Sequence, residues 1–200
     1  MSETQLRHQT DSIEPLLAKT EAVLHGHFRL SSGLHSDTYI QCARILSHPQ
    51  YAEQIGRDIA AQVKAQGIGP IDVVVGPALG GVIVAHEVAR ALSVCSLFAE
   101  RQGTELVLRR GFTLTPGQRV LVVEDVITTG GSAEETARLV SSQGGVVVSF
   151  ACIVARGNSH KLSPLVSLFQ LTPSVWQEAA CVLCQQGLPV EKPGSRPVAS

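Results

Sequence analysis

Three runs of mostly β-branched residues constrain the fold of this 200-residue chain more than any other feature. They are IDVVVG (71–76), RVLVVED (119–125) and GVVVSFACIVA (145–155), and helical patterns near 81–92 and 132–142 lie between them. The runs do not alternate apolar with polar residues, which is typical of strands buried on both faces of a parallel sheet. The order of strands and helices therefore predicts an α/β protein with a central parallel sheet flanked by helices.

The neighbouring segments predict further elements. An amphipathic pattern predicts a helix over about 11–24, and the Ser- and Gly-broken stretch 25–41 predicts a turn-rich pair of strands. A Ser-His-Pro start and a glycine near the end predict a long helix over about 48–67. Two short apolar runs, VCSLFA (94–99) and LVSLFQL (165–171), predict additional strands.

The remaining segments are less regular. Residues 100–118 show weak alternation and several polar side chains, so we expect a projecting hairpin or a mobile flap there. A Thr-Pro pair predicts the start of a helix over about 172–187, and the tail 191–200 is expected to be flexible. The length suits a single domain, which we place at residues 1–190.

Composition excludes several classes of protein. A formal net charge of −1 argues against a generally basic surface for nucleic acid. No apolar run approaches the roughly 18 residues of a membrane span, and the first residues contain no apolar signal core. The five cysteines, an odd number mostly within apolar runs, favour a reducing compartment. We therefore expect a cytoplasmic protein without a nucleic-acid or membrane partner.

The stretch VLVVEDVITTGGS (120–132) carries the clearest chemistry. Glu124 and Asp125 follow the strand directly and would lie at the carboxyl edge of the sheet, where α/β proteins bind ligands. Carboxylates suit hydroxyl recognition, metal binding and stabilisation of positive charge. Thr128 to Ser132 add hydroxyls, backbone N–H groups and a helix start that suit a phosphate. The alternative is an ordinary strand-to-helix turn with Ser132 as the N-cap.

Generic nucleotide-binding motifs are absent from the sequence. It contains no G-x-x-x-x-G-K-[ST] stretch, and no G-x-G-x-x-G follows the first central strand. These absences disfavour an ATPase and a dinucleotide-dependent dehydrogenase.

The stretch resembles the phosphoribosyl pyrophosphate signature of type I phosphoribosyltransferases. By that resemblance the acidic pair holds the ribose 2′ and 3′ hydroxyls, and the following loop wraps the 5′-phosphate. The glycine-rich segment 76–81, GPALGG, is similar to the pyrophosphate loop of the same family; its alternative is an ordinary Gly-Pro turn with close backbone packing. The residues that the resemblance assigns to the donor are Glu124, Asp125, Val126, Ile127, Thr128, Thr129, Gly130, Gly131, Ser132, Ala78, Leu79, Gly80 and Arg101.

A second resemblance concerns the acceptor. FRLSSGLHSDTYIQ (28–41) is similar to the N-terminal hood segment of orotate phosphoribosyltransferases, which implies that Tyr39 and Ile40 line the base pocket. Arg156 falls where those enzymes carry an arginine that pairs with the substrate carboxylate, and Thr128 where a hydroxyl contacts the base. A guanidinium suits a planar carboxylate because it can bind both oxygens. The hood is expected over about 1–45 plus the C-terminal segment, and the core over about 46–160.

The chain departs from the better-known orotate enzymes in three places. Their lysines before the hood Ser-Gly and in the pyrophosphate loop correspond to Ser31 and Gly80, and their loop with two lysines and a histidine corresponds to RQGTELVLRRGF. Arg101 matches the arginine that opens the family loop. Arg109 and Arg110 either supply positive charge to pyrophosphate or form a solvated hairpin face. These departures leave the base specificity open.

Cysteines and histidines offer a competing interpretation. The Cys181-x-x-Cys184 pair has no second cluster and lies on a helical pattern, which favours packing over zinc or redox chemistry. His25, His27 and His35 crowd the hood, but their spacing gives no clear metal set. We therefore expect scattered surface or pocket histidines.

Together the resemblances imply an enzyme that transfers the phosphoribosyl group from phosphoribosyl pyrophosphate to orotate. The catalytic residues would be Glu124, Asp125 and Arg101, with Mg²⁺ held through the substrate rather than by protein ligands. The family is usually homodimeric. Two alternatives stay open: the same transfer to another purine or pyrimidine base, and a non-catalytic regulator that binds phosphoribosyl pyrophosphate.

Overall fold

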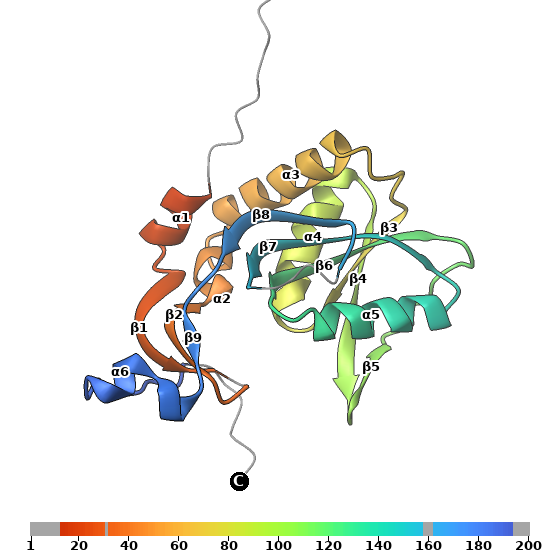
Figure 1. The fold of residues 1–200 in the computed structure, drawn as a ribbon. Coiled ribbons are helices and arrows are strands. Elements are labelled where there is room, and N and C mark those ends of the chain that lie inside the picture. Colours follow the sequence, from red (N-terminus) through yellow and green to blue (C-terminus); the bar gives the residue numbers. More distant parts are fainter. Residues whose placement is uncertain (1–12, 31, 158–161, 194–200) are drawn as a thin grey trace, which may run out of the picture.

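The computed structural model describes residues 13–30, 32–157 and 162–193. Its centre is a six-stranded sheet in the order β5-β4-β3-β6-β7-β8 (Figure 1). All neighbours pair in parallel except β4 and β5, which form an antiparallel edge. The strands are β3 (Val73–Pro77), β4 (Cys95–Gln102), β5 (Glu105–Leu108), β6 (Arg119–Ile127), β7 (Val146–Arg156) and β8 (Leu165–Leu171). The predicted fold class, a central parallel sheet flanked by helices, is confirmed.

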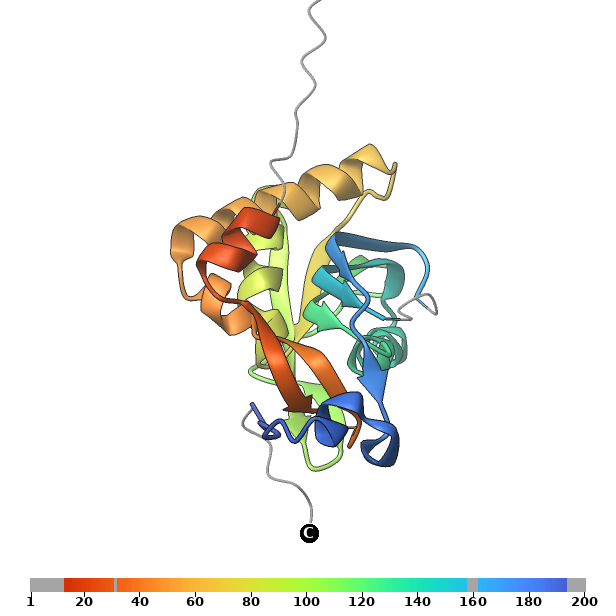
Figure 2. The ribbon, with the colours of Figure 1, turned by 60° about the vertical axis from the view of Figure 1, so that its left-hand side comes forward.

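Helices cover both faces of this sheet, which explains why its central strands lack alternation. In β6, Leu121 and Val123 join the core with α3 (Pro49–Ala65) and α4 (Gly80–Leu92). Val120 and Val122 join the second core, together with residues of α5 (Gly131–Ser142). Because successive side chains of a strand point to opposite faces, both sets must be apolar. Figure 2 shows the same layers from another side.

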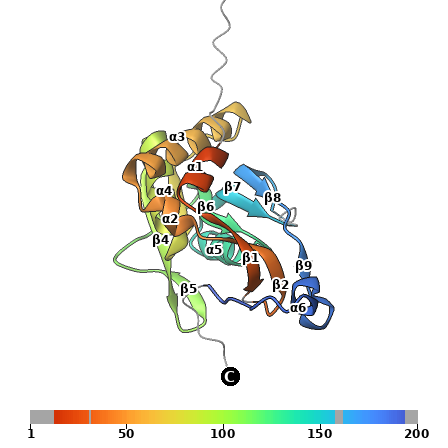
Figure 3. The same ribbon diagram turned by 90° about the vertical axis from the view of Figure 1, so that its left-hand side faces the viewer.

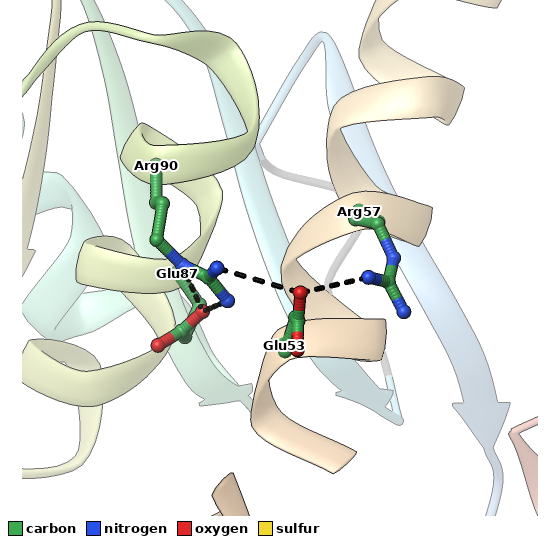
Figure 4. A network of polar contacts seen from close by, with 4 residues as sticks. All are labelled: Glu53, Arg57, Glu87 and Arg90. Carbon is green, nitrogen blue, oxygen red and sulfur yellow. Dashed lines mark hydrogen bonds and ion pairs between the residues drawn. The ribbon is translucent and has the colours of Figure 1, made fainter. Parts of the chain in front are cut away.

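The helices α3 and α4 approach each other closely at Gly56. A Cβ atom on Gly56 would lie 2.5 Å from the carbonyl carbon of Glu87 in α4, so only glycine fits there without a shift of the backbone. On the exposed side of the same contact, Glu53 accepts from Arg57 at 2.8 Å and from Arg90 at 3.4 Å (Figure 4). Ion pairs this exposed contribute little to stability, so the close packing at Gly56 matters more.

A small antiparallel sheet, the hood sheet, lies beside the central sheet (Figures 1 and 3). It consists of β1 (Val23–Arg29), β2 (His35–Ile40) and β9 (Val175–Trp176), in that order. The predicted pair of strands corresponds to β1 and β2. A five-residue helix that the sequence did not predict, α2 (Cys42–Leu46), connects β2 to α3. Chain ends that are far apart in sequence thus form one unit.

The N-terminal helix is shorter than predicted. α1 spans Glu14–Lys19, whereas the predicted helix reached Leu24; residues 11 and 12 lie outside the described part. The chain reverses at Glu21, whose φ is 50°, and Leu24 pairs with Tyr39 within the hood sheet. Backbone pairing with β2 therefore overrides the helical periodicity of the last predicted turn.

The predicted helix over 172–187 is wrong. This segment contains β9, a short 3-10 helix η1 (Glu178–Ala180) and a four-residue helix α6 (Val182–Gln185). Val175 pairs with Ser36 of β2, so the segment completes the hood sheet instead of continuing as a helix. The predicted tail begins at residue 191, but Glu191 donates to the His27 carbonyl at 2.7 Å and accepts from Arg29 N–H at 2.8 Å. Residues 194–200 lie outside the described part.

Residues 100–118 begin with a hairpin, formed by β4 and β5, that projects from the central sheet (Figure 1). The predicted hairpin is thus confirmed. No helix among the described residues is both long and apolar enough to span a membrane.

Candidate active site

A cavity of about 470 Å³ lies at the carboxyl edge of β3 and β6. Its lining residues are Pro77, Ala78, Leu79, Gly80, Arg101, Leu106, Glu124, Asp125 and Ser132. Segments 76–81 and 120–132, both assigned to a phosphoribosyl donor from sequence, therefore meet at one cavity. Figure 1 shows why they meet: β3 and β6 are neighbours in the sheet, and each is followed by a helix at the same edge.

The acidic pair lies inside β6, which runs to Ile127, two residues past the predicted end. Burial and the neighbouring Asp125 raise the pKa of Glu124 to about 7, against a hydrogen bond from Ser132 that lowers it. Burial also raises the pKa of Asp125, although the Val126 N–H, 2.9 Å from Asp125 Oδ1, opposes this shift. Two largely desolvated carboxyls side by side favour a ligand that brings hydroxyl donors or positive charge.

The segment after the acidic pair forms the turn into α5. Thr128 and Thr129 are exposed, and Gly130 precedes the helix in the left-handed conformation, with φ of 85°. The alternative reading, with Ser132 as the N-cap, is wrong because Gly130 holds that position and Ser132 bonds to Glu124. The exposed hydroxyls and the first N–H groups of a 12-residue helix provide the donors that a phosphate needs.

The glycine-rich segment 76–81 packs directly against the acidic pair. A Cβ atom on Gly80 would lie 2.5 Å from Asp125 Oδ1, and one on Gly76 would lie 2.6 Å from the Gly81 carbonyl oxygen. Ala78 and Leu79 line the cavity, and the Leu79 side chain is 87% exposed. The close backbone packing predicted for an ordinary Gly-Pro turn is therefore present. The same packing also brings segment 76–81 against the carboxylate of Asp125.

Two arginines of this region, Arg101 and Arg110, are already paired, whereas Arg109 is exposed. Arg101 lines the cavity, but its two terminal nitrogens donate to Glu135 at 2.7 and 2.9 Å. Arg110 donates to Glu100 through two nitrogens, both at 2.9 Å, and lies 5.6 Å from the Phe98 ring centroid. The pair between Arg110 and Glu100 thus stabilises the base of the hairpin. Because Arg101 lines the cavity, a ligand there can replace Glu135 as the partner of its guanidinium.

Arg156 ends β7 and reaches the hood. Its Nη2 donates to Ser36 Oγ at 3.0 Å and to the Thr38 carbonyl at 3.4 Å. Its Nε is buried and has no hydrogen-bond partner among the described residues. Burial lowers the pKa of Arg156, with opposing effects from Asp37 and Tyr39. A half-buried guanidinium with an unsatisfied donor favours an anionic ligand.

Tyr39 lies near enough to Asp125 and Arg156 for both charges to act on its phenol. Burial raises the pKa of its phenol, the charge of Asp125 raises it further, and the charge of Arg156 lowers it. Ile40, its neighbour in β2, packs against the apolar core instead. Thr128 follows the β6–β7 pair Ile127↔Ala155 by one residue, which puts it beside Arg156. Tyr39, Thr128 and Arg156 are thus close together, whereas the Ile40 side chain points elsewhere.

Sequence reasoning missed several residues of the site. Ser36 holds Arg156, Glu135 holds Arg101, and Cys42 and Cys152 lie beneath the carboxylates. Burial raises the pKa of both thiols, to about 12 for Cys152, so both stay neutral. Only Ser36 had a signal in the sequence, because it ends the Ser-Gly-x-x-Ser core of the hood segment.

A second cavity, of about 360 Å³, lies between α3 and α4. Its charged lining includes Glu53, Arg57, Glu87 and Arg90, which pair with one another (Figure 4). These four charges neutralise one another, and Lys64 is the remaining charged residue of the lining. The cavity contains none of the residues that the sequence assigns to the donor or the acceptor.

Comparison with known proteins agrees with this geometry. Residues 42–183 match the family described as "Phosphoribosyl transferase domain". The chain is 49% identical to "Orotate phosphoribosyltransferase" of Pelotomaculum thermopropionicum, with 94% of this chain and 98% of the relative covered. It is 46% identical to the protein of that name from Thermotoga maritima, over 92% of this chain and 98% of the relative. The crystal structure of orotate phosphoribosyltransferase from Aeropyrum pernix is 30% identical, with a TM-score of 0.67 over 79% of this chain and 93% of that chain.

By fold, site and family match, the chain is a phosphoribosyltransferase. Within that class it belongs to the orotate phosphoribosyltransferase family, as its identity to relatives over nearly their whole length shows. The sequence predictions of the family, the fold and the enzyme class are thereby confirmed.

Proposed function

We propose that this protein transfers the phosphoribosyl group from phosphoribosyl pyrophosphate to orotate, giving orotidine 5′-monophosphate and pyrophosphate. The observation that supports this acceptor most directly is Arg156, a half-buried guanidinium whose Nε has no partner among the described residues. It follows the β7 residue that pairs with Ile127, so it lies at the start of the turn that follows the acidic pair. Orotate carries a planar carboxylate, which a guanidinium can bind through two parallel hydrogen bonds. The relatives that carry the name orotate phosphoribosyltransferase agree with this choice.

In the proposed reaction, a ring nitrogen of orotate gives up its proton to solvent and forms a bond to C1′ of the ribose as the bond from C1′ to the pyrophosphate oxygen breaks. Positive charge grows on the ribose while negative charge grows on the leaving group. Glu124 and Asp125 bind the ribose hydroxyls and oppose the positive charge. Thr128 to Ser132 bind the 5′-phosphate, and the 76–81 segment lies next to the leaving group. Tyr39 covers the base and helps to exclude water.

The residues of the cavity are compatible with Mg²⁺ brought in by the substrate. The lining contains carboxylate and hydroxyl oxygens from Glu124, Asp125 and Ser132, and no cysteine or histidine. Mg²⁺ prefers oxygen ligands and commonly binds through substrate phosphates. When bound, it would neutralise charge on the pyrophosphate, and the acidic pair would keep its role toward the ribose.

Arg101 is the basic residue best placed to meet the leaving group. It lines the cavity, and its bidentate pair with Glu135 is exposed enough for solvent to weaken it. A pyrophosphate in the cavity competes with Glu135 for the guanidinium. Arg110 is less suited because its pair with Glu100 holds the base of the hairpin.

The test is pyrophosphate release from phosphoribosyl pyrophosphate and Mg²⁺, with orotate, uracil and purine bases offered separately. We expect release with orotate. Release only with another base would contradict the acceptor, and release with none would contradict the enzyme and favour a regulator. Asp125→Asn is expected to lower turnover about 10²-fold or more without unfolding the protein. The matched control is Asp72→Asn, because Asp72 pairs with Arg119 at the opposite end of β6.

A homodimer and a cytoplasmic location stay predictions. Light scattering of the purified protein measures its mass in solution. A monomeric mass would contradict the predicted homodimer.

A further inference from the structure

Four potential metal ligands meet in the hood, away from the cavity described above. They are His27 of β1, His35 of β2, Cys181 and Cys184. One ligand atom from each lies within 4.8 Å of every other, and the first three residues are buried. Neither Cys181 nor Cys184 forms a disulfide bond. The expectation of scattered histidines is therefore wrong for His27 and His35, which lie with the cysteine pair, whereas His25 is not part of the cluster.

The distances between the ligand atoms suit one small central ion. His27 Nε2 lies 2.8 Å from His35 Nδ1, 3.4 Å from Cys181 Sγ and 3.7 Å from Cys184 Sγ. His35 Nδ1 lies 3.3 Å from Cys184 Sγ. Ligands of a tetrahedral zinc site, with bonds of about 2.0–2.3 Å, lie about 3.3–3.8 Å apart. These three nitrogen–sulfur distances fall in this range, the remaining pairs lie within 4.8 Å, and the two nitrogens need to separate by about half an ångström.

The hydrogen bond on the far side of His27 supports the same conclusion. His27 Nδ1 lies 2.9 Å from the Leu188 carbonyl oxygen, which can only accept, so Nδ1 carries the proton. In the neutral imidazole, Nε2 then presents its lone pair to the other three ligand atoms. A backbone carbonyl in this role is the usual outer partner of a metal-bound histidine.

We propose that His27, His35, Cys181 and Cys184 bind a structural Zn²⁺ ion. Two thiolates and two imidazoles in a closed set of four are the ligands of structural zinc sites, whereas Mg²⁺ and Ca²⁺ require oxygen ligands. A Cys-x-x-Cys pair at the start of a short helix supplies two of the ligands, as in many zinc sites. The site does not take part in phosphoribosyl transfer, so the proposal is independent of the acceptor.

The ion would fasten the C-terminal segment to the hood sheet. Strands β1 and β2 supply the histidines, and residues 181–184 supply the thiolates. Within the hood sheet and the described segment 177–193, the buried apolar side chains are Phe28 and Cys181, while His27, His35, Ser36 and Thr38 are buried and polar. A small unit without an adequate apolar core commonly depends on a metal or disulfides. Ser36 follows the ligand His35 directly and holds Arg156, so the ion also fixes the strand that positions this arginine.

Metal content tests the proposal directly. The untagged protein, purified under reducing conditions without chelator, is analysed by inductively coupled plasma mass spectrometry. We expect close to one zinc per chain, and X-ray absorption should show two sulfur ligands near 2.3 Å and two nitrogen ligands near 2.0 Å. Removal of the metal with a strong chelator should lower Tm by several degrees, and added Zn²⁺ should restore it.

Matched variants separate this site from adventitious metal. Cys184→Ser and His27→Asn should lose the zinc, while Cys95→Ser and His25→Asn should retain it, because Cys95 and His25 are exposed and lie outside the cluster. If the ligand variants do not fold, the wild-type absorption spectrum and the chelator titration still decide the question. Wild-type protein that neither contains nor takes up zinc, a Cys181–Cys184 disulfide found by peptide mapping, or equal zinc in Cys184→Ser would overturn the proposal.

Discussion

Glu124→Gln should make the ligand-free protein more stable at neutral and alkaline pH while it weakens activity. Burial and Asp125 raise the pKa of Glu124 from its ordinary 4.5 to about 7. A group whose pKa is higher in the folded state stabilises that state fully below its unfolded pKa, and the contribution is lost as pH rises through the folded pKa. The relevant window is therefore pH 4.5 to 7. Glutamine is uncharged throughout, so the variant escapes this loss.

The magnitude follows from the size of the pKa shift. Each unit corresponds to about 1.4 kcal/mol, so wild-type protein loses about 3 kcal/mol of unfolding free energy across the window. For a chain of this length, that difference corresponds to roughly 6–12 °C in Tm. At pH 5 Glu124 is still protonated in the folded protein, and the expected gap between variant and wild type falls below about 1 kcal/mol.

Thermal melts of both proteins at pH 5 and pH 8, without ligand, measure the effect. The control is Glu134→Gln, since Glu134 lies in the first turn of α5, its side chain is 43% exposed, and it is 3.9 Å from its partner Arg138. It should show no gain that grows with pH. Equal Tm differences at both pH values, or a less stable Glu124→Gln at pH 8, would refute the reasoning. Turnover of Glu124→Gln should fall about 10²-fold because the ribose loses a charged partner.

Two further substitutions examine the acceptor and the donor side of the cavity. Arg156→Lys should raise KM for orotate at least about tenfold and leave KM for phosphoribosyl pyrophosphate nearly unchanged, because lysine lacks the planar fork; an Arg119→Lys control should change neither constant. Gly80→Ala should lower kcat/KM for phosphoribosyl pyrophosphate about tenfold, because its Cβ would lie 2.5 Å from Asp125 Oδ1. If a folded Gly80→Ala variant has unchanged kinetics, the Asp125 carboxylate can move away from the new Cβ without loss of activity, and the prediction is contradicted.

Much of the central fold was predictable because its signals are local. The apolar runs of β3, β6 and β7 and the helices after them appear within short windows of sequence, and parallel pairing follows from their burial on both faces. The errors lie in the hood, where the ends of two predicted helices became strands. In the hood, the backbone forms hydrogen bonds with another strand, β2. The hydrophobic periodicity of a short window contains no information about such a partner strand.

The candidate site also contains a part that the sequence predicts and a part that it does not. The acidic pair and the turn from Thr128 to Ser132 are contiguous in sequence, so a single motif predicts both. Arg156 was assigned only by resemblance, and its partner Ser36 lies 120 residues away. The pairing of Arg101 could not be predicted from the sequence, because its partner Glu135 lies in α5, 34 residues further along the chain.

By itself, then, the sequence determined the parallel sheet and predicted the phosphoribosyl donor site, since both arise from residues close together along the chain. Only the tertiary structure decided the pairing of the arginines and the meeting of His27 with Cys181, which are 154 residues apart. The reason is physical: hydrophobic periodicity and turn chemistry act over a few residues, whereas a ligand set assembled from chain ends exists only after those ends have packed.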